Sequence, residues 1–405
     1  MKLALLFPGQ GAQYPGMCQT LYKQYATVRE TFEEASEILK FDIAKSCFEG
    51  ETENCQDTRS NQINVLVSSI SMYRMYQNEV GIIPDYMAGH SLGEYSALCC
   101  AGAIDFADVL QIVDRRGIMM NEVEGKQKSM MAAVYDMDKI ALEKLCAHMS
   151  SSEEVVVVSN YNSSGQLVVS GNINAVNRVM QTVGEQGYRA VPLNVKAAFH
   201  SPIFSGITPM LHEMLQEFSF HDPTVPVISN TTAAPYTSSV NIAENLVTHL
   251  TAPVRWQESM HYLVSNGVTG TIEIGPGHTL TSLLKNEYDE IHIYTFDDSN
   301  DRNYCDCWLN QSGMWTKREL LKHMRMCQKH AICTQNYNAE EHEYRKEVLK
   351  PYRELTKLMN EAETHAEFVT QARYQNMLGL MQKIWHGKKV PPLEQKLRLD
   401  AISRK

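Results

Sequence analysis

The sequence Gly89-His90-Ser91-Leu92-Gly93 most constrains the fold of this chain, because it directly follows a short apolar strand at residues 86–88. A serine between two such glycines is typical of a sharp strand-to-helix turn, in which the glycines allow a strained backbone. The turn lifts the serine Oγ above the strand end and onto a helix N-terminus, which favours a developing negative charge. The motif predicts a nucleophilic Ser91 in an α/β fold. The alternative is an ordinary loop serine, because a five-residue pattern also arises by chance.

The segments around this motif predict an α/β core with a parallel sheet. Apolar strands are expected at residues 2–7, 86–88, 226–229 and 270–274, and helices at 22–39 and 62–76. Strands that alternate with helices in this way are typical of α/β domains. The first strand runs into Pro8-Gly9-Gln10-Gly11, a glycine loop whose backbone can come close to a ligand.

The pattern changes between residues 128 and 195, where four apolar strands are expected at 130–134, 155–158, 166–170 and 190–195. Two helical segments separate them in the order βαββαβ, which predicts an inserted ferredoxin-like subdomain. The large α/β-hydrolase-like subdomain then comprises residues 1–127 and 196–295.

Residues 296–405 are expected to form a helical C-terminal extension. An oxygen side chain followed three residues later by Glu is a helix-start signal, because each group can satisfy a free amide near the other. Pro351 should break or bend the second of these helices after Leu349. The three expected starts are Thr316/Glu319, Asn338/Glu341 and Thr364/Glu367.

Composition excludes several classes of protein. The net charge of −10 over 405 residues argues against a nucleic-acid binder. No apolar run approaches the roughly 18 residues that span a bilayer. The ten cysteines are scattered without paired spacing, and the apolar run at residues 3–7 is too short for a signal peptide. We therefore expect a cytoplasmic protein without membrane or nucleic-acid partners.

A serine nucleophile needs a base within hydrogen-bond reach. His200 is the best candidate among fourteen histidines, because it follows the strand at 190–195 and small residues beside it leave the imidazole accessible. The alternative is a histidine at a helix start beside Pro202.

Arg116 is predicted to point inward from a helix that Asp105 caps. Val109, Val113 and Met120 share its helical face and are apolar, whereas the adjacent Arg115 points about 100° away. A buried guanidinium needs an anion, which is either a structural carboxylate or the carboxylate of a substrate held by the two-pronged guanidinium.

Seven motifs follow one another along the first 290 residues: Phe7-Pro8-Gly9-Gln10-Gly11, Ala88-Gly89-His90-Ser91-Leu92-Gly93-Glu94-Tyr95-Ser96-Ala97, Arg115-Arg116-Gly117, Asn160-Tyr161-Asn162-Ser163, Ala198-Phe199-His200-Ser201, Pro253-Val254-Arg255-Trp256 and Glu273-Ile274-Gly275-Pro276-Gly277. In this order they resemble the malonyl-CoA:acyl carrier protein transacylases and the acyltransferase domains of fatty acid and polyketide synthases.

The resemblance implies roles for individual residues. Ser91 and His200 would form a catalytic dyad, with the imidazole oriented by the backbone carbonyl of His249 instead of an Asp. The amides of Gln10 and Leu92 would form the oxyanion hole. Three residues would contact the substrate: Arg116 would hold the malonyl carboxylate, Phe199 would crowd a methyl branch and so favour malonyl over methylmalonyl, and Asn160 would line the site.

The resemblance also implies a reaction and partners. Malonyl would pass from malonyl-CoA to Ser91 and then to the phosphopantetheine thiol of a holo acyl carrier protein by a ping-pong mechanism, with no cofactor and no metal. The extension after residue 295 resembles those of acyltransferases that act in trans on polyketide synthases. The alternative pathway is fatty acid synthesis.

Other functions remain open from the sequence. An acyl hydrolase that strips stalled acyl groups from carrier proteins would share the fold but tends to lack the arginine found at Arg116. An α/β-hydrolase esterase would need an acidic residue between nucleophile and histidine. A carrier-protein scaffold without chemistry would not need Ser91 and His200.

Two features of the extension suggest further sites. Basic residues near the C-terminus suggest a docking surface for acidic carrier proteins, against the alternative of a solvated face; they are Lys383, Lys388, Lys389, Lys396, Arg398, Arg404 and Lys405. Cysteines and histidines at helical spacing are of the types that bind zinc, but small buried cysteines explain them better; they are Cys305, Cys307, His323, Cys327, His330 and Cys333.

Overall fold

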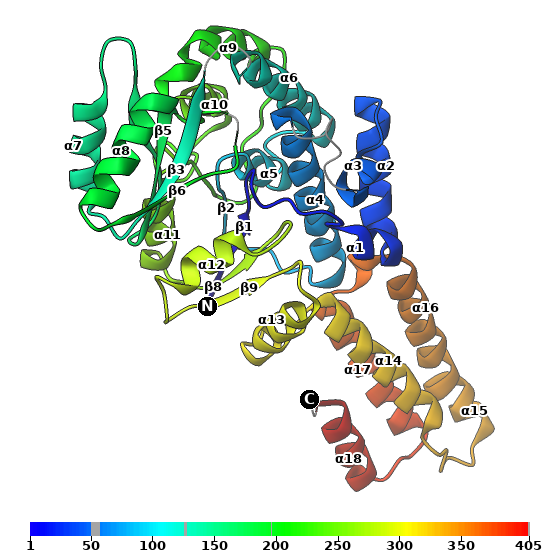
Figure 1. The fold of residues 1–405 in the computed structure, drawn as a ribbon. Coiled ribbons are helices and arrows are strands. Elements are labelled where there is room, and N and C mark those ends of the chain that lie inside the picture. The colour runs from blue at the N-terminus through cyan, green and yellow to red at the C-terminus, as the bar shows by residue number, and fades with distance from the viewer. Residues whose placement is uncertain (50–56, 125–127, 196, 404–405) are drawn as a thin grey trace. The chain divides into compact units, whose positions relative to one another are not determined.

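A computed structural model describes residues 1–49, 57–124, 128–195 and 197–403 of the chain (Figure 1). These residues form two compact units. The larger comprises Met1–Met75 and Pro84–Cys305, and the smaller comprises Tyr76–Ile83 and Asp306–Lys405. The predicted subdomain boundaries at 127/128 and 195/196 each involve a residue outside the described part of the chain.

A parallel five-stranded sheet forms the centre of the larger unit. Its order is β7-β2-β1-β8-β9, and every described pairing in it is parallel. In β1, Leu3 to Phe7 are all buried, as expected for a parallel strand covered on both faces. The predicted α/β fold with a parallel sheet is therefore confirmed. The strands are β1 (Lys2–Phe7), β2 (Tyr86–Gly89), β7 (Val227–Ile228), β8 (Val268–Glu273) and β9 (His292–Thr295).

Helices cover both faces of this sheet. On one face, Ala4 and Leu6 share an apolar cluster with α11 and α12. On the other, the Phe7 ring packs edge-on against Tyr73 of α4 at 6.2 Å between centroids. The helices of the larger unit around this sheet are α1 (Gln19–Gln24), α2 (Ala26–Leu39), α3 (Ile43–Glu49), α4 (Thr58–Glu79, whose last turn belongs to the smaller unit), α5 (Gly93–Cys100), α6 (Phe106–Glu124), α9 (Thr208–Leu215), α10 (Ile242–His249), α11 (Trp256–Ser265) and α12 (Thr279–Lys285), with 3-10 turns at Pro202–Ile207 and Ser239–Asn241.

One predicted helix of this unit is two helices. The segment 22–39 is interrupted at Tyr25, which has the extended dihedrals φ −118° and ψ 121° and separates α1 from α2. The predicted helix at 62–76 is present and longer, as α4.

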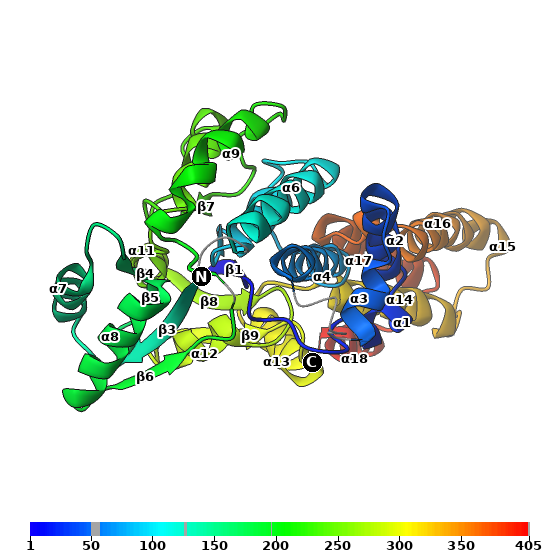
Figure 2. The same cartoon turned by 45° about the horizontal axis from the view of Figure 1, so that its top comes forward.

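A second sheet in the larger unit has four antiparallel strands in the order β4-β5-β3-β6. Its apolar face packs against α7 and α8 (Figure 2). The last strand is shorter than predicted: it ends at Pro192, although the Leu193 amide still donates to the Met131 carbonyl of β3 at 2.9 Å. The elements are β3 (Ser129–Tyr135), α7 (Lys139–Met149), β4 (Val156–Ser163), β5 (Gln166–Asn172), α8 (Ile173–Glu185) and β6 (Arg189–Pro192).

The smaller unit is helical around its own apolar core, which α14, α16 and α17 supply with buried residues such as Met324, Leu355, Met377 and Trp385. Its elements are the last part of α13 (Ser299–Gln311), α14 (Lys317–Cys333), α15 (Glu341–Tyr344), a π-helical turn at Arg345–Leu349, α16 (Lys350–Thr364), a 3-10 turn at Ala366–Phe368, α17 (Gln371–Gly387) and α18 (Pro392–Ser403).

The predicted helix starts in this unit have mixed outcomes. Thr316 caps α14, and its Oγ1 accepts from the Glu319 amide at 3.2 Å as predicted. Pro351 lies in the first turn of α16, but the predicted break after Leu349 is wrong: Leu349 and Lys350 keep right-handed helical dihedrals, and the π-helical turn at Arg345–Leu349 leads directly into α16. The start at Thr364 is wrong, because that residue ends α16 and its hydroxyl donates to the Asn360 carbonyl. Asn338 is not the N-cap of α15 either, because Glu340 occupies that position; Asn338 Oδ1 accepts from the Glu340 amide, and its Nδ2 donates to the Gly387 carbonyl.

Lys388 contradicts the predicted basic docking surface. It is buried, and its Nζ donates to the carbonyls of Ala331, Ile332 and Thr334 at 2.9, 3.3 and 2.7 Å. These carbonyls lie at the C-terminal end of α14, where a cation is favoured. Lys389 and Arg398 form ion pairs with Glu343 and Glu394. Arg404 and Lys405 of that prediction lie outside the described residues.

The candidate zinc ligands do not converge. His323 is buried and its Nδ1 donates to the Glu319 carbonyl at 2.8 Å, while Cys327 belongs to the apolar core. Within the described parts of the chain, no three His, Cys, Asp or Glu side chains gather as metal ligands.

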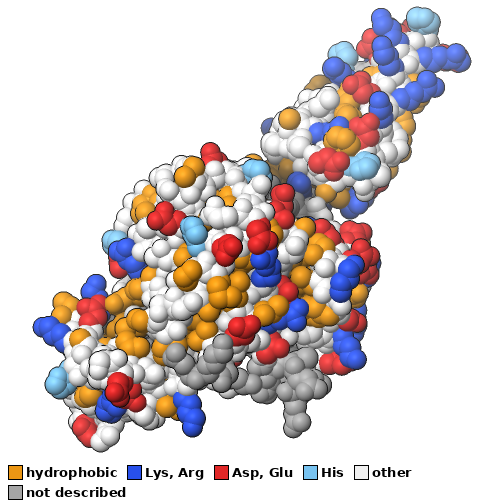
Figure 3. Space-filling model, turned by 90° about the horizontal axis from the view of Figure 1, so that it is seen from above, with side chains coloured by type: hydrophobic (Ala, Val, Ile, Leu, Met, Phe, Trp, Pro, Cys, Tyr) orange, Lys and Arg blue, Asp and Glu red, His pale blue; other side chains and the backbone are white. Residues whose placement is uncertain are grey.

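No helix of those parts is long and apolar enough to cross a membrane. Figure 3 shows acidic and basic side chains interspersed over the face in view.

Candidate active site

The turn between β2 and α5 holds Ser91 in a strained conformation. Ser91 has φ 52°, in the left-handed region that non-glycine residues seldom occupy. The flanking chain can come this close only at glycines. A Cβ on Gly93 would lie 2.0 Å from the Phe7 carbonyl oxygen, and one on Gly9 would lie 2.5 Å from the His90 carbonyl oxygen. The two glycines therefore bring the loop of Gln10 beside Ser91.

Asn230, which follows β7, clamps the same turn. Its Oδ1 accepts from the Ser91 amide at 2.7 Å, and its Nδ2 donates to the Gly89 carbonyl at 2.6 Å. One side chain thus satisfies a backbone donor and a backbone acceptor on the two sides of His90. A strained turn persists when its surroundings fix it in this way.

Ser91 and His200 are within hydrogen-bond distance. Ser91 Oγ lies 2.7 Å from His200 Nε2, and His200 Nδ1 donates to the main-chain carbonyl of His249 at 2.8 Å. Because a carbonyl can only accept, Nδ1 carries the proton and Nε2 of the neutral ring is free to accept from the serine. His200 also has a left-handed backbone, with φ 56°.

The imidazole of His200 is held neutral. It is buried, and this desolvation lowers its pKa to about 3, although the bond to the His249 carbonyl acts in the opposite direction. The positive charge of Arg116 lowers the pKa further. The ring is therefore an acceptor over the whole physiological pH range.

Arg116 lies inside the same cavity, as its helical position predicted. It is 4% exposed, whereas Arg115 points outward and pairs with Glu217. The Arg116 Nη1 donates to Gln62 Oε1 at 2.6 Å, and its guanidinium lies over the Tyr95 ring at 5.3 Å. No carboxylate of the described residues forms an ion pair with it, and burial lowers its pKa. A buried cation with neutral partners is suited to an anionic ligand.

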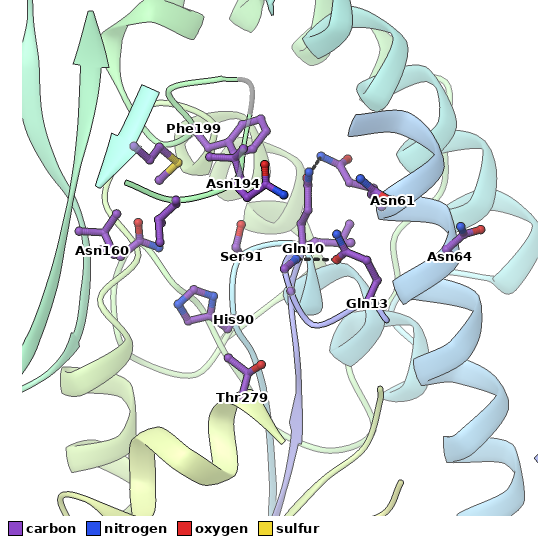
Figure 4. A pocket seen from close by; sticks show the side chains of 18 of the residues that line it. Gln10, Gln13, Asn61, Asn64, His90, Ser91, Asn160, Asn194, Phe199 and Thr279 are labelled. Atoms are coloured by element: carbon purple, nitrogen blue, oxygen red, sulfur yellow. Dashed lines mark hydrogen bonds between the residues drawn. The ribbon is translucent and has the colours of Figure 1, made fainter. Parts of the chain in front are cut away.

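A cavity of about 700 Å³ brings these groups together. Figure 4 shows Ser91 near its centre, with Phe199 and Asn194 on one side, Asn160 on another and the Gln10 loop opposite. All the residues predicted to contact the substrate or the oxyanion line it, namely Gln10, Ser91, Leu92, Arg116, Asn160, Phe199 and His200. His249 contributes its carbonyl from behind His200.

Three groups of this site were not predicted. Gln62, on the buried helix α4, donates from Nε2 to Gln10 Oε1 at 3.2 Å while its Oε1 accepts from Arg116. His90 lines the cavity with its Nε2 2.8 Å from Asn162 Oδ1. Asn230 supports the turn from 139 residues away. Long-range amide contacts of this kind leave no periodic signal, although His90 and Asn162 were within the quoted motifs.

Comparison with known proteins identifies the class. The family of the acyl transferase domain matches residues 4–308. The chain therefore belongs to the acyl transferase family, and within it the chain is homologous to malonyl CoA-acyl carrier protein transacylases.

Two curated relatives carry that name. One from Bacillus subtilis is 34% identical over 396 residues, which covers 97% of this chain and 98% of the relative. Another, from Escherichia coli strain K12, is 38% identical over 291 residues, which covers 72% of this chain and 94% of the relative. The first alignment covers nearly the whole chain and so includes the helical extension, whereas the second covers 72% of the chain.

Solved structures agree with this fold. An acyl carrier protein S-malonyltransferase from Vibrio cholerae has a TM-score of 0.72 at 36% identity, covering 75% of this chain and all of the other. A malonyl-transacylase in complex with its type II PKS acyl-carrier protein has a TM-score of 0.72 at 33% identity, covering 74% of this chain and 97% of the other.

Proposed function

We propose that this chain transfers malonyl from malonyl-CoA to the phosphopantetheine thiol of a holo acyl carrier protein through an ester on Ser91. The observation that carries the proposal is the 2.7 Å contact of Ser91 Oγ with a neutral His200, in a cavity that also holds a buried Arg116 with no acidic partner among the described residues. The names of the relatives support the same reaction.

The chemistry proceeds in two half-reactions. His200 Nε2 takes the Ser91 proton as Oγ attacks the thioester carbonyl, and the amides of Gln10 and Leu92 stabilise the oxyanion. The C–S bond then breaks, and the CoA thiolate takes the proton from Nε2. In the second half-reaction the carrier thiol gives its proton to Nε2, attacks the ester, and Ser91 leaves with that proton. No electrons are transferred, so we propose that no cofactor is needed.

Arg116 and Gln62 would select the substrate. The guanidinium would bind the malonyl carboxylate, and Gln62 would orient it through the 2.6 Å bond from Nη1. Phe199 lies against the Phe204 ring at 5.8 Å and lines the cavity, so it would crowd a methyl group at the malonyl C2. Asn160 would form another part of the wall.

The architecture proposed to support this reaction has three parts. The parallel-sheet part resembles α/β-hydrolases, and the four-stranded sheet with α7 and α8 would be a ferredoxin-like subdomain, since βαββαβ with the order β4-β5-β3-β6 is the arrangement of that fold. The domain limits 1–127 with 196–295, 128–195 and 296–405 remain proposals. We propose a cytoplasmic location.

We also propose that the chain serves a polyketide synthase in trans. The observation in favour is the helical extension, which one relative shares over nearly its whole length. Because the name of that relative does not state a pathway, fatty acid synthesis is the second candidate, and assays with the two kinds of carrier protein distinguish the two pathways.

The test is intact-mass measurement of the acyl group on the protein after incubation with malonyl-CoA, methylmalonyl-CoA or acetyl-CoA, followed by holo carrier protein. We expect a malonyl adduct that passes to the carrier faster than it hydrolyses. It should be absent in Ser91→Ala and lost in Arg116→Ala, but kept in Arg115→Ala. Rapid hydrolysis, or a preference for acetyl that ignores Arg116, would make the chain an editing acyl hydrolase and contradict the proposal.

A further inference from the structure

Glu94 is a buried carboxyl group that the proposed reaction does not use. It lies in the first turn of α5, three residues after Ser91, and is 1% exposed. Its neighbours in this helix are small or apolar, and Tyr95, Ser96, Ala97 and Leu98 are also buried. Burying a carboxyl group costs free energy unless specific partners compensate.

The partners of Glu94 come from two segments outside its own helix. Glu94 Oε2 accepts from the main-chain amide of Asn230 at 3.2 Å and lies 3.4 Å from His249 Nδ1. Glu94 Oε1 accepts from the Tyr236 hydroxyl. Thus one carboxyl group joins α5, the segment after β7 and the end of α10.

Two of these partners hold the dyad. The side-chain amide of Asn230 fixes the Ser91 turn through its Oδ1 and Nδ2 atoms, and the His249 carbonyl fixes the tautomer of His200. The His249 ring also packs against the His200 ring, with 4.8 Å between centroids and 30° between planes. Displacement of either partner would change the distance between Ser91 Oγ and His200 Nε2.

We propose that Glu94 is a positioning residue, which sets the geometry of the Ser91–His200 dyad by binding Asn230 and His249 at the same time. This inference rests on the proposed function only in so far as Ser91 is the nucleophile. It concerns neither recognition of malonyl nor the carrier protein.

Protonation gives this role a distinct signature. Burial raises the pKa of Glu94 to about 7, although hydrogen bonds from Tyr236, Asn230 and Ser229 act against that shift. The titratable groups facing it are His249, whose pKa burial lowers well below the ordinary value, and Tyr236 and Tyr95, whose pKa values burial raises. Only the ionised carboxylate accepts from all its partners. The reactivity of Ser91 should therefore fall below about pH 7, where His200, with its pKa of about 3, does not titrate.

The experiment compares wild type, Glu94→Gln and Tyr236→Phe with the control Glu122→Gln, which changes an exposed residue of α6. Two rates are measured between pH 5 and 9: labelling of Ser91 by a serine-directed fluorophosphonate, and formation of the malonyl adduct. We expect Glu94→Gln to lower both rates at pH 8 at least tenfold, with KM for malonyl-CoA within twofold of wild type because Arg116 and Gln62 are unchanged. In addition, the rates of this variant should no longer fall as the pH drops below about 7, which is the acidic limb of the wild-type pH profile.

The outcomes separate the two proposals. Wild-type labelling without any malonyl adduct would refute the proposed function but leave the role of Glu94 testable by the label. Wild-type rates and an unchanged acidic limb in Glu94→Gln would overturn the inference. If that variant does not fold, Tyr236→Phe removes one contact and should lower both rates severalfold, and equality with Glu122→Gln would then overturn it.

Discussion

Lys388 offers a sharp test of how the smaller unit is held together. Its ammonium group donates to three carbonyls at the end of α14, those of Ala331, Ile332 and Thr334. The last carbonyls of a helix have no partner within the helix, so this side chain supplies what the helix cannot. Lys388→Met keeps much of the side-chain volume and removes the three donors.

The expected cost follows from those bonds. A hydrogen bond to a charged group contributes roughly 2 kcal/mol, so three contribute about 6 kcal/mol. Methionine has no ammonium group to desolvate, and this offsets the loss of free energy of unfolding by about 3 kcal/mol. We therefore expect Lys388→Met to lower the free energy of unfolding of the smaller unit by about 3 kcal/mol.

Tryptophan fluorescence during urea unfolding measures this loss. Of the four tryptophans of the chain, Trp308, Trp315 and Trp385 belong to the smaller unit and only Trp256 to the larger. With a slope of about 2 kcal/mol per molar urea for a unit of this size, the midpoint should fall by about 1.5 M.

The matched control is Lys383→Met on α17, the helix that ends just before Lys388. Lys383 is exposed, and substitutions of this kind stay within about 0.5 kcal/mol of wild type. Equal midpoints for the two variants would refute the idea that Lys388 stabilises the end of α14.

Three further predictions concern the larger unit. Gly93→Ala should lower the free energy of unfolding by at least about 3 kcal/mol, because its Cβ would meet the Phe7 carbonyl at 2.0 Å, whereas Gly184→Ala, with no atom near its Cβ, should not; thermal unfolding compares them. Between about pH 4.5 and 7 the folded chain keeps the Glu94 proton that the unfolded chain releases, so stability falls as pH rises. The free energy of unfolding of wild type minus that of Glu94→Gln should therefore drop by about 3 kcal/mol over that range. The buried histidines act in the opposite direction, but they are present in both proteins and cancel in this difference. A difference that stays constant with pH would contradict the prediction. Arg115→Ala should change KM for malonyl-CoA less than twofold, since its guanidinium pairs with Glu217 outside the cavity; a tenfold rise would show that it contacts the substrate.

The sequence predicted the groups of the site whose chemistry depends on local patterns. Ser91 was predicted from glycine spacing and Arg116 from helical phase, and both lie in the cavity. The carbonyl at His249 came only from the family resemblance, since a backbone group has no sequence signature of its own. Local patterns could not assign the roles of three other residues, because their partners are tens of residues away. Two of them, Gln62 and Asn230, are neutral amides, and Glu94 is one residue within a longer motif.

The fold shows the same division between local and distant causes. Four strands of the parallel sheet were predicted, because burial on both faces requires continuous apolar runs. The strand β9 was not predicted, since only two of its four residues are buried. Helix starts were less predictable, because Thr364 matches a capping pattern but follows a helix that had already begun at Lys350. The actual cap of α17 is Thr370, whose Oγ1 accepts from the Arg373 amide. Lys388 was misplaced because charge alone does not reveal which carbonyls lie nearby.

The last turn of α4 has a consequence for anyone who divides this chain. Residues Tyr76–Ile83 belong to the smaller unit, and Val80 accepts through its carbonyl from the Lys317 amide at 2.9 Å while Glu79 pairs with Arg318. An expression fragment that stops where the family match ends, at residue 308, would keep this segment but lose those partners. It would expose Tyr76 and Val80, which are 1% and 3% exposed in the whole chain. The catalytic part should therefore be produced with its extension, or with those two apolar side chains replaced by polar ones.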